Sequence, residues 1–128
     1  MNHVNRPADP QPEVFSRAGE MFAVLSSPVR LHLIWALAEG ERDVSQLQDR
    51  VGRALPTVSQ HLTQLRLAGL VQARRHRRRH IYSIREPYAL TIVQAMLDEQ
   101  LKQVCSAAGT EPRGPVPVRR EDGLALEG

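Results

Sequence analysis

The sequence is poor in cysteine, in aromatic residues and in long apolar runs. Its single cysteine, Cys105, excludes an intramolecular disulfide framework in this chain of 128 residues. No apolar run reaches the roughly 18 residues of a membrane-spanning helix, and the polar N-terminus lacks the apolar region of a signal peptide. We therefore expect a cytoplasmic protein without a membrane partner.

Residue patterns typical of catalysis are also absent. The sequence shows no Ser/His/Asp or Cys/His set on plausible elements and no glycine-rich phosphate loop. It also lacks a pair of carboxylates that a cleft could bring together. We therefore expect a protein that is not an enzyme.

Acidic residues are missing from one long stretch of the chain. From Arg50 to Arg85 there are nine arginines and no Asp or Glu, whereas both flanking segments are net acidic, so the whole chain carries only +3. A positive block between two acidic segments indicates a polyanionic partner bound at a defined surface. The alternative is a solvated, arginine-rich loop without a partner.

The basic block coincides with a helix followed by two strands. Val58, Leu62 and Leu65 form one apolar stripe at i, i+4 and i+7, which predicts a helix over Pro56–Ala68. Leu70–Ser83 has β-branched and aromatic residues on both sides of an arginine cluster, which predicts two short strands joined by a basic turn. A polar-faced helix and a basic hairpin are typical of a winged helix-turn-helix.

Four further helices are predicted from apolar periodicity and end signals. They cover Glu13–Leu25, Pro28–Gly40, Val44–Val51 with Asp43 as its N-cap, and a last helix from Glu86-Pro87 to about Ser106. The fold class is therefore mostly α with a small β-hairpin wing. We expect one domain over residues 13–106, with disordered tails at 1–12 and 107–128, because the tails are polar, contain proline and lack periodicity.

Several short motifs, taken in order and spacing, make the chain similar to a known family. The motifs are Ser27-Pro28-Val29-Arg30-Leu31, Val44-Ser45-Gln46-Leu47, Pro56-Thr57-Val58-Ser59-Gln60-His61-Leu62, Leu65-Arg66, Ala68-Gly69-Leu70-Val71, and Arg74-Arg75 through Tyr82-Ser83-Ile84. Over about residues 20–104 they resemble the ArsR/SmtB family of bacterial transcriptional repressors. The resemblance implies a homodimer of winged helix-turn-helix subunits on a palindromic operator, released by an inducer that is often a metal ion.

Polar side chains on the Pro56–Ala68 helix are the expected readers of double-stranded DNA. A glutamine paired with adenine is the most discriminating contact available to them, while the arginines should position the duplex through its phosphates. His61 lies beside the apolar stripe, so phosphate contact and helix packing are both open. The predicted DNA-contact residues are Arg53, Thr57, Ser59, Gln60, His61, Gln64, Arg66, Arg75, Arg77, Arg78 and Arg79.

A winged-helix module for protein or RNA contact is the competing hypothesis. The basic block does not separate the two, since RNA also binds basic surfaces. The lack of surface aromatic residues on the polar-faced helix favours duplex DNA, because single-strand readers usually stack bases on aromatic rings.

The turn of the predicted hairpin departs from the family pattern. The wing of such proteins usually turns through Asp-Gly or Glu-Gly, and here that place is taken by His76-Arg77. Without glycine, a turn that needs a positive φ costs about 1 kcal/mol. The tip therefore either takes another turn type or stays mobile until it meets phosphate.

The apolar stripe of the last helix needs a partner surface. We expect dimerisation through the first and last helices, with the first helix covering part of the stripe and a symmetry mate covering the rest. A purely intramolecular helix contact is the alternative. The predicted interface residues are Val14, Ala18, Met21, Leu90, Val93, Leu97, Leu101 and Val104.

A metal-sensing site is predicted only through the N-terminus. Among metal-sensing relatives, ligands recur as a cysteine pair on the third helix, which this chain lacks, or as carboxylates and histidines on the last helix, which has no histidine here. The terminal amine, two amide nitrogens and His3 could bind Ni(II) or another divalent metal, with Glu86 or Glu99 as oxygen ligands. The alternative for His3 is a residue of a disordered tail.

Three other effector hypotheses remain at the sequence level. Cys105 could sense oxidants through a disulfide with its dimer mate or through sulfenic acid, although an inert cysteine at a helix end is the simpler interpretation. An organic inducer between the terminal helices is a second hypothesis. A repressor without any ligand is the third.

Overall fold

The computed structural model describes residues 8–110, with side chains to residue 107. The described residues divide into two compact units, residues 8–93 and 94–110. None of the helices in the described part of the chain is long and apolar enough to cross a membrane. The elements, in order, are α1 (Pro12–Leu25), α2 (Pro28–Leu37), β1 (Arg42–Asp43), α3 (Val44–Val51), α4 (Leu55–Leu67), β2 (Val71–His76), β3 (Arg79–Ile84) and α5 (Pro87–Thr110).

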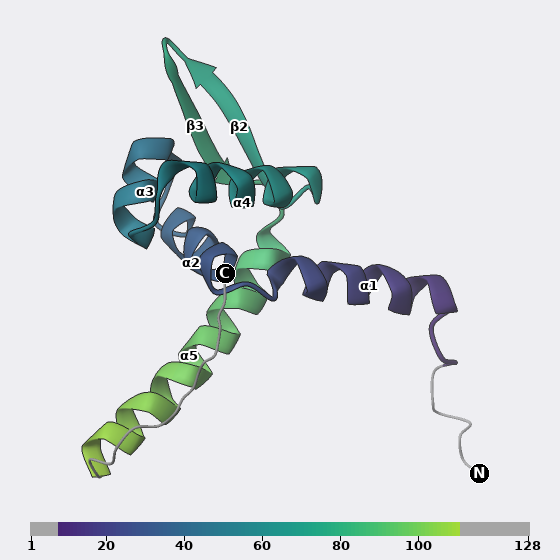
Figure 1. Cartoon of the computed structure of the whole chain (residues 1–128). Helices are drawn as coiled ribbons and strands as arrows, with labels where there is room; N and C mark the ends of the chain where they lie inside the picture. Colours follow the sequence, from purple (N-terminus) through teal and green to yellow (C-terminus); the bar gives the residue numbers. More distant parts are fainter. Residues whose placement is uncertain (1–7, 111–128) are drawn as a thin grey trace, which may run out of the picture. The chain divides into compact units, whose positions relative to one another are not determined.

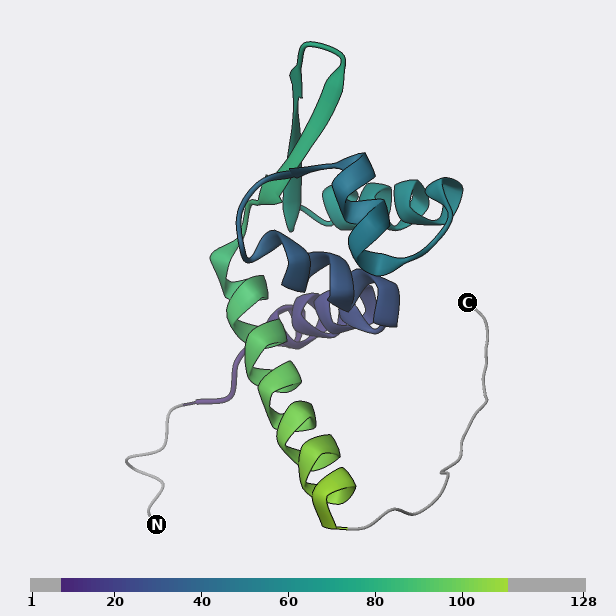
Figure 2. The same cartoon turned by 90° about the vertical axis from the view of Figure 1, so that its left-hand side faces the viewer.

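The helices α2, α3 and α4 enclose the core of the first unit (Figure 1). Its fully buried side chains include the stripe predicted for α4, because every third or fourth residue of that helix faces α2 and α3. The hairpin β2–β3 projects away from these helices in both views (Figure 1, Figure 2). The largest core side chains are Leu33, Ile34, Leu47, Val58, Leu62, Leu65, Leu70, Val71 and Val93.

Of the two helices of the helix-turn-helix, α3 begins and ends where the sequence predicts, and α4 begins and ends one residue earlier than predicted. The Asp43 carboxylate accepts the Gln46 N–H at 2.8 Å, and the Gln46 side chain accepts the Asp43 N–H at 2.9 Å, which completes a capping box. Gly52 ends α3 with φ of 67°, in the left-handed region that glycine adopts freely. This turn directs the chain into α4, whose Pro56 occupies the first turn.

The sheet has three strands, where the sequence predicts two. The extra strand, β1, pairs antiparallel with β3, so the strand order is β1-β3-β2. Arg42 lies opposite Tyr82 and Asp43 lies opposite Ile81. Two residues are too few to show an alternating pattern, which is why β1 escapes a sequence-based prediction.

The wing turns one residue later than predicted. His76 pairs with Arg79, so Arg77 and Arg78 form the tip, and the expectation that His76-Arg77 makes the turn is wrong. Arg77 has φ of 63° and is the sole non-glycine residue with positive φ in the described part of the chain. The hairpin therefore closes through a strained arginine instead of taking a turn type that suits every residue.

The C-terminal ends of α2 and α5 also differ from the prediction. α2 ends at Leu37, and residues 38–40 form a turn in which Gly40 has φ of 135°. α5 continues to Thr110, four residues into the predicted tail. In the second unit, residues 94–110 form a helix that exposes Met96, Leu101 and Val104.

A glycine exchange at the tip tests the strain at Arg77. Arg77→Gly removes the left-handed strain, whereas Arg78→Gly only adds freedom to the unfolded chain, and both remove one positive charge. We expect Arg77→Gly to be more stable than Arg78→Gly by about 1 kcal/mol in urea unfolding. Equal free energies of unfolding would contradict a strained tip.

Candidate nucleic-acid interface

The outer face of α4 carries polar side chains over a fully buried stripe. Ser59, Gln60 and Gln64 are exposed, and Thr57 is half-buried at the start of the helix. The stripe on the opposite side fixes the rotation of the helix, so the polar face is held outward. Gln60 and Gln64 lie one turn apart on this face, where their amides can both donate and accept hydrogen bonds.

The tip of the wing presents arginines without carboxylate partners. Arg75, Arg77 and Arg78 are exposed and form no ion pair within residues 8–110. The Arg75 Nε donates to the backbone carbonyl of Arg77 at 3.2 Å, which braces the tip. Arg53 and Arg66, at either end of α4, are likewise exposed and without an ion pair among these residues.

Two arginines on the strands of the wing, in contrast, are held by carboxylates that precede α3. Arg74 pairs with Glu41 at 2.7 Å, and Arg79 pairs with Asp43. Arg79 is one of the predicted phosphate contacts; its side chain pairs with Asp43 yet stays 57% exposed, so the phosphate contact stays a prediction. Antiparallel pairing of β1 with β3 brings Asp43 next to this residue, which the sequence spacing did not reveal.

Asp43 joins the wing to the helix-turn-helix. Its side chain caps α3 and also accepts a hydrogen bond from Arg79. The Gln46 N–H holds the pKa of this carboxyl below its usual range, and the Arg79 guanidinium acts in the same direction. The residue is only 9% exposed, so its charge depends on these partners.

A second cluster of charge lies on the turn between α2 and β1. Glu39 accepts hydrogen bonds from Arg42 at 2.6 Å and from Arg50 at 2.9 Å. The Arg50 hydrogen bond is the main cause that lowers the pKa of Glu39, with Arg42 contributing less. The acidic segment before α3 thus neutralises part of the basic block and leaves the arginines of α4 and the wing tip uncompensated.

His61 is half-buried on α4, beside the exposed Gln60. Its Nδ1 lies 3.0 Å from the Arg30 NH1, and Arg30 also donates to the carbonyl of Val24. Burial lowers the pKa of His61, and the charges of Arg30 and Arg53 lower it further. Packing and phosphate contact are both open from the sequence; the structure adds a contact with Arg30, and the phosphate contact stays a prediction. No local pattern indicated Arg30.

Comparison with known proteins identifies the family. The model of the bacterial regulatory proteins of the arsR family matches residues 27–73. The chain is similar to the biofilm growth-associated repressor of Xylella fastidiosa, with 36% identity over 99 residues that cover 75% of this chain and 87% of that protein. The chain belongs to the ArsR family of bacterial regulatory proteins.

Solved structures of this family share the fold. The transcriptional repressor BigR from Xylella fastidiosa has a TM-score of 0.60 at 36% identity, covering 69% of this chain and 93% of that one. The homodimeric winged helix-turn-helix DNA-binding domain of a possible ArsR-family regulator from Mycobacterium bovis has a TM-score of 0.62 at 30% identity, covering 77% and 94%. This ArsR-family chain is accordingly a winged helix-turn-helix, DNA-binding repressor and not an enzyme.

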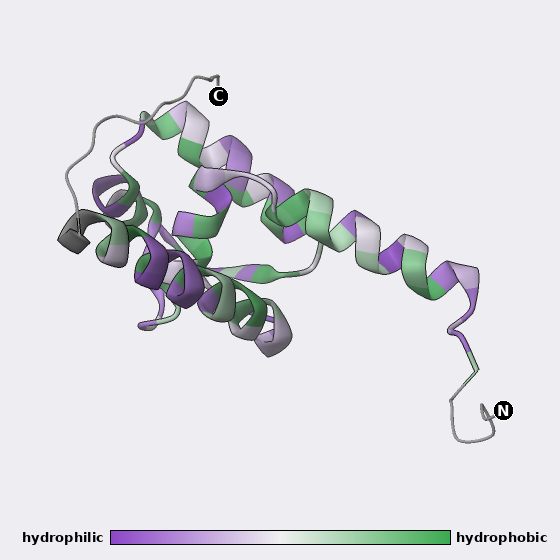
Figure 3. Ribbon diagram, turned by 90° about the horizontal axis from the view of Figure 1, so that it is seen from below, coloured by the Kyte–Doolittle hydropathy of each residue, from purple (hydrophilic) through white to green (hydrophobic). Residues whose placement is uncertain are grey.

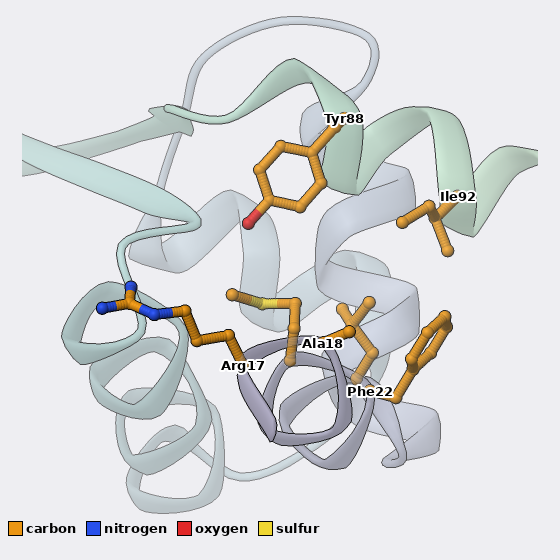
Figure 4. Close-up of a pocket in the computed structure, with 7 residues that line it drawn as sticks. Arg17, Ala18, Phe22, Tyr88 and Ile92 are labelled. Carbon is orange, nitrogen blue, oxygen red and sulfur yellow. The ribbon is translucent and has the colours of Figure 1, made fainter. Parts of the chain in front are cut away.

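An apolar groove lies between α1 and the first turns of α5 in this ArsR-family chain (Figure 4). Tyr88 and Ile92 of α5 face Ala18 and Phe22 of α1 across it, and Arg17 stands at its edge. The groove has a volume of about 340 Å³ and is lined mainly by carbon atoms. Hydrophobic residues recur along α1 in Figure 3, and none of the helix from residue 12 to residue 20 is buried.

The predicted interface residues divide between surface and core. Ala18 and Met21 line the groove, and Val14 is 52% exposed nearby in sequence. Val93 is a correction, because it is 1% exposed in a single chain and belongs to the core of the first unit. Leu90 is half-buried in the first unit. In the second unit Leu97 is half-buried, whereas Leu101 and Val104 are exposed.

The structure does not test the predicted effector residues. No group of three or more His, Cys, Asp or Glu side chains that could hold a metal occurs within the described residues. His3 lies outside those residues, Glu86 belongs to the first unit, and Glu99 belongs to the second. Cys105 is an exposed, free cysteine of the second unit. The nickel and redox hypotheses stay predictions.

Single alanine variants of two neighbouring arginines distinguish a side chain that contacts phosphate from one that stabilises the fold. Arg78→Ala should lower the slope of log affinity against log salt by about 1 and leave the free energy of unfolding within about 0.5 kcal/mol. Arg79→Ala should leave the slope unchanged and cost about 1 kcal/mol of stability, because Asp43 loses a partner. Salt-dependent DNA affinity and urea unfolding measure the two effects. A lower slope in both variants would show that Arg79 also meets phosphate.

Proposed function

We propose that this ArsR-family protein represses transcription as a homodimer on a palindromic operator. The observation that carries the proposal is the polar outer face of α4, flanked by arginines that have no ion pair in the described residues. In this arrangement α4 lies in the major groove, and the wing tip contacts the adjacent phosphate backbone. Sequence discrimination then falls to the exposed glutamines, since arginine–phosphate contacts carry no base information.

The homodimer is supported by apolar surface that one chain leaves uncovered. The groove between α1 and α5 exposes Phe22, at 59%, and Tyr88, at 45%. The helix of the second unit exposes Leu101 and Val104 as a separate apolar strip. A two-fold axis through a dimer would set two copies of α4 about one DNA turn apart, roughly 34 Å, and so requires a palindromic site.

Binding to DNA from upstream of its own gene tests the operator. Fluorescence anisotropy should show tight binding of the tag-free protein to one palindromic duplex and at least tenfold weaker binding to a duplex with one half-site scrambled. Gln64→Ala should weaken binding by about 1–3 kcal/mol on the palindrome and much less on the scrambled duplex, because the amide reads a base. The control is Gln72→Ala on the wing strand β2, whose side chain faces Ser83.

Equal affinity for the palindrome, the scrambled duplex and single-stranded RNA would contradict the operator and favour the RNA-binding alternative. An unchanged ratio between palindrome and scrambled duplex in Gln64→Ala would show that this residue does not read a base.

A charge placed in the groove tests the homodimer. Sedimentation velocity should give twice the 14.4 kDa chain mass for the wild type. Phe22→Glu should shift the protein toward the monomer by at least tenfold in the dimerisation constant, because a carboxylate would be buried among apolar side chains. Ala23→Glu adds the same charge to an exposed position of α1 outside the groove and should leave the dimer intact. A wild type that sediments as a monomer at micromolar concentration would rule out this dimer.

A further inference from the structure

Arg30 connects three helices of the first unit. It lies in the first turn of α2, and its backbone N–H is held by the Ser27 hydroxyl at 3.3 Å. Its Nε donates to the carbonyl of Val24, in the last turn of α1, at 2.5 Å. Its NH1 lies 3.0 Å from the Nδ1 of His61 on α4. One half-buried side chain therefore contacts both the end of α1 and the middle of α4.

The Arg30 contact fixes the protonation state of His61. A guanidinium only donates hydrogen bonds, so Nδ1 of His61 must accept, and the proton of the neutral ring then sits on Nε2. Burial and the nearby charges of Arg30 and Arg53 lower the pKa of His61, which favours this neutral ring. A second proton on the ring would occupy Nδ1 and remove the acceptor.

We propose that Arg30 is a positioning residue for DNA recognition, which ties α4 through His61 to the C-terminal end of α1. His61 is adjacent to Gln60 and three residues before Gln64, so a restraint on its ring restrains the rotation of the reading face. The other end of the restraint is a backbone carbonyl of α1, the helix that contributes most of the groove. The inference rests on the operator binding proposed above.

The geometry requires arginine at this position. The guanidinium is a planar fork whose Nε–H and NH1 groups bind two acceptors that belong to different helices. A lysine would keep the charge but would offer a single ammonium at one point. Charge and positioning can therefore be separated by comparing Arg30→Lys with Arg30→Met.

The first experiment measures operator affinity and its salt dependence for both variants. Arg30→Lys and Arg30→Met should each bind the palindromic duplex about tenfold more weakly, the loss expected for a hydrogen bond to a charged group. The salt slope should stay at the wild-type value, because Arg30 does not meet phosphate. A slope lowered by about 1 in Arg30→Met, with wild-type behaviour of Arg30→Lys, would make Arg30 a phosphate contact and overturn the proposal.

A double-mutant cycle tests whether Arg30 acts through His61. The double variant that combines Arg30→Met and His61→Ala should lose no more operator affinity than either single variant, because each substitution alone already removes the contact between the two side chains. Additive losses would overturn the link. Far-UV circular dichroism and urea unfolding confirm that the variants are folded.

NMR titration of the histidine rings in the DNA-free protein gives a readout that general destabilisation would not move. Arg30→Met should raise the pKa of His61 toward its ordinary value and leave His32 unchanged, because burial and Arg50 set the lowered pKa of His32. Arg50→Met is the matched control, and it should raise the pKa of His32 only. Equal responses of both histidines to Arg30→Met would overturn the assignment.

This NMR experiment also separates the inference from the proposed function. A wild type that binds no palindrome contradicts the operator alone. In that case, backbone shifts caused by Arg30→Met at both the end of α1 and the middle of α4 would still support the positioning role. Shifts confined to α2 would overturn it.

Discussion

The carboxylate of Asp43 is the interaction on which the arrangement of helix-turn-helix and wing depends. The carboxylate caps α3 and accepts a hydrogen bond from Arg79. The backbone of the same residue pairs with Ile81 of β3. The first contact places α3, and the other two place the wing relative to α3. Because the side chain is almost fully buried, loss of either partner leaves a charge without solvation. One residue therefore holds the helix-turn-helix and the wing in a single geometry.

The distribution of charge follows from the same anchoring. The three acidic residues on the approach to α3, namely Glu39, Glu41 and Asp43, bind arginines of α3, β1 and the two wing strands. Ion pairs at the protein surface add little stability, so their main effect here is to decide which arginines remain available. The available ones lie beside α4 and at the wing tip, where a duplex would pass. A net charge of +3 thus conceals a concentrated positive surface.

Local patterns in the sequence were sufficient for the helices and for the polar face of α4. The stripe of Val58, Leu62 and Leu65 set the helix rotation, and the Asp43 cap set the start of α3, because both signals lie within a few residues. Contacts between distant residues were not predictable in this way. Arg30 and His61 are 31 residues apart in sequence, and no periodicity connects them.

Two other misses have the same physical origin. β1 is too short for a pattern, so neither the third strand nor the pair between its last residue and Arg79 could be inferred. Val93 follows the apolar repeat of the last helix, yet it is buried by its own subunit. An apolar repeat predicts that a residue is buried. The tertiary fold decides whether the same chain or a second subunit buries it.

The strained turn at the wing tip sets a cost in folding against a gain in the proposed DNA binding. Glycine at the position of Arg77 would relax the backbone but would remove one of two adjacent cations at the part of the wing farthest from the core. The backbone strain is independent of salt, whereas the attraction of the arginine to phosphate weakens as salt increases. In the proposed complex with DNA, the contact of Arg77 with phosphate would therefore outweigh the backbone strain only below some ionic strength.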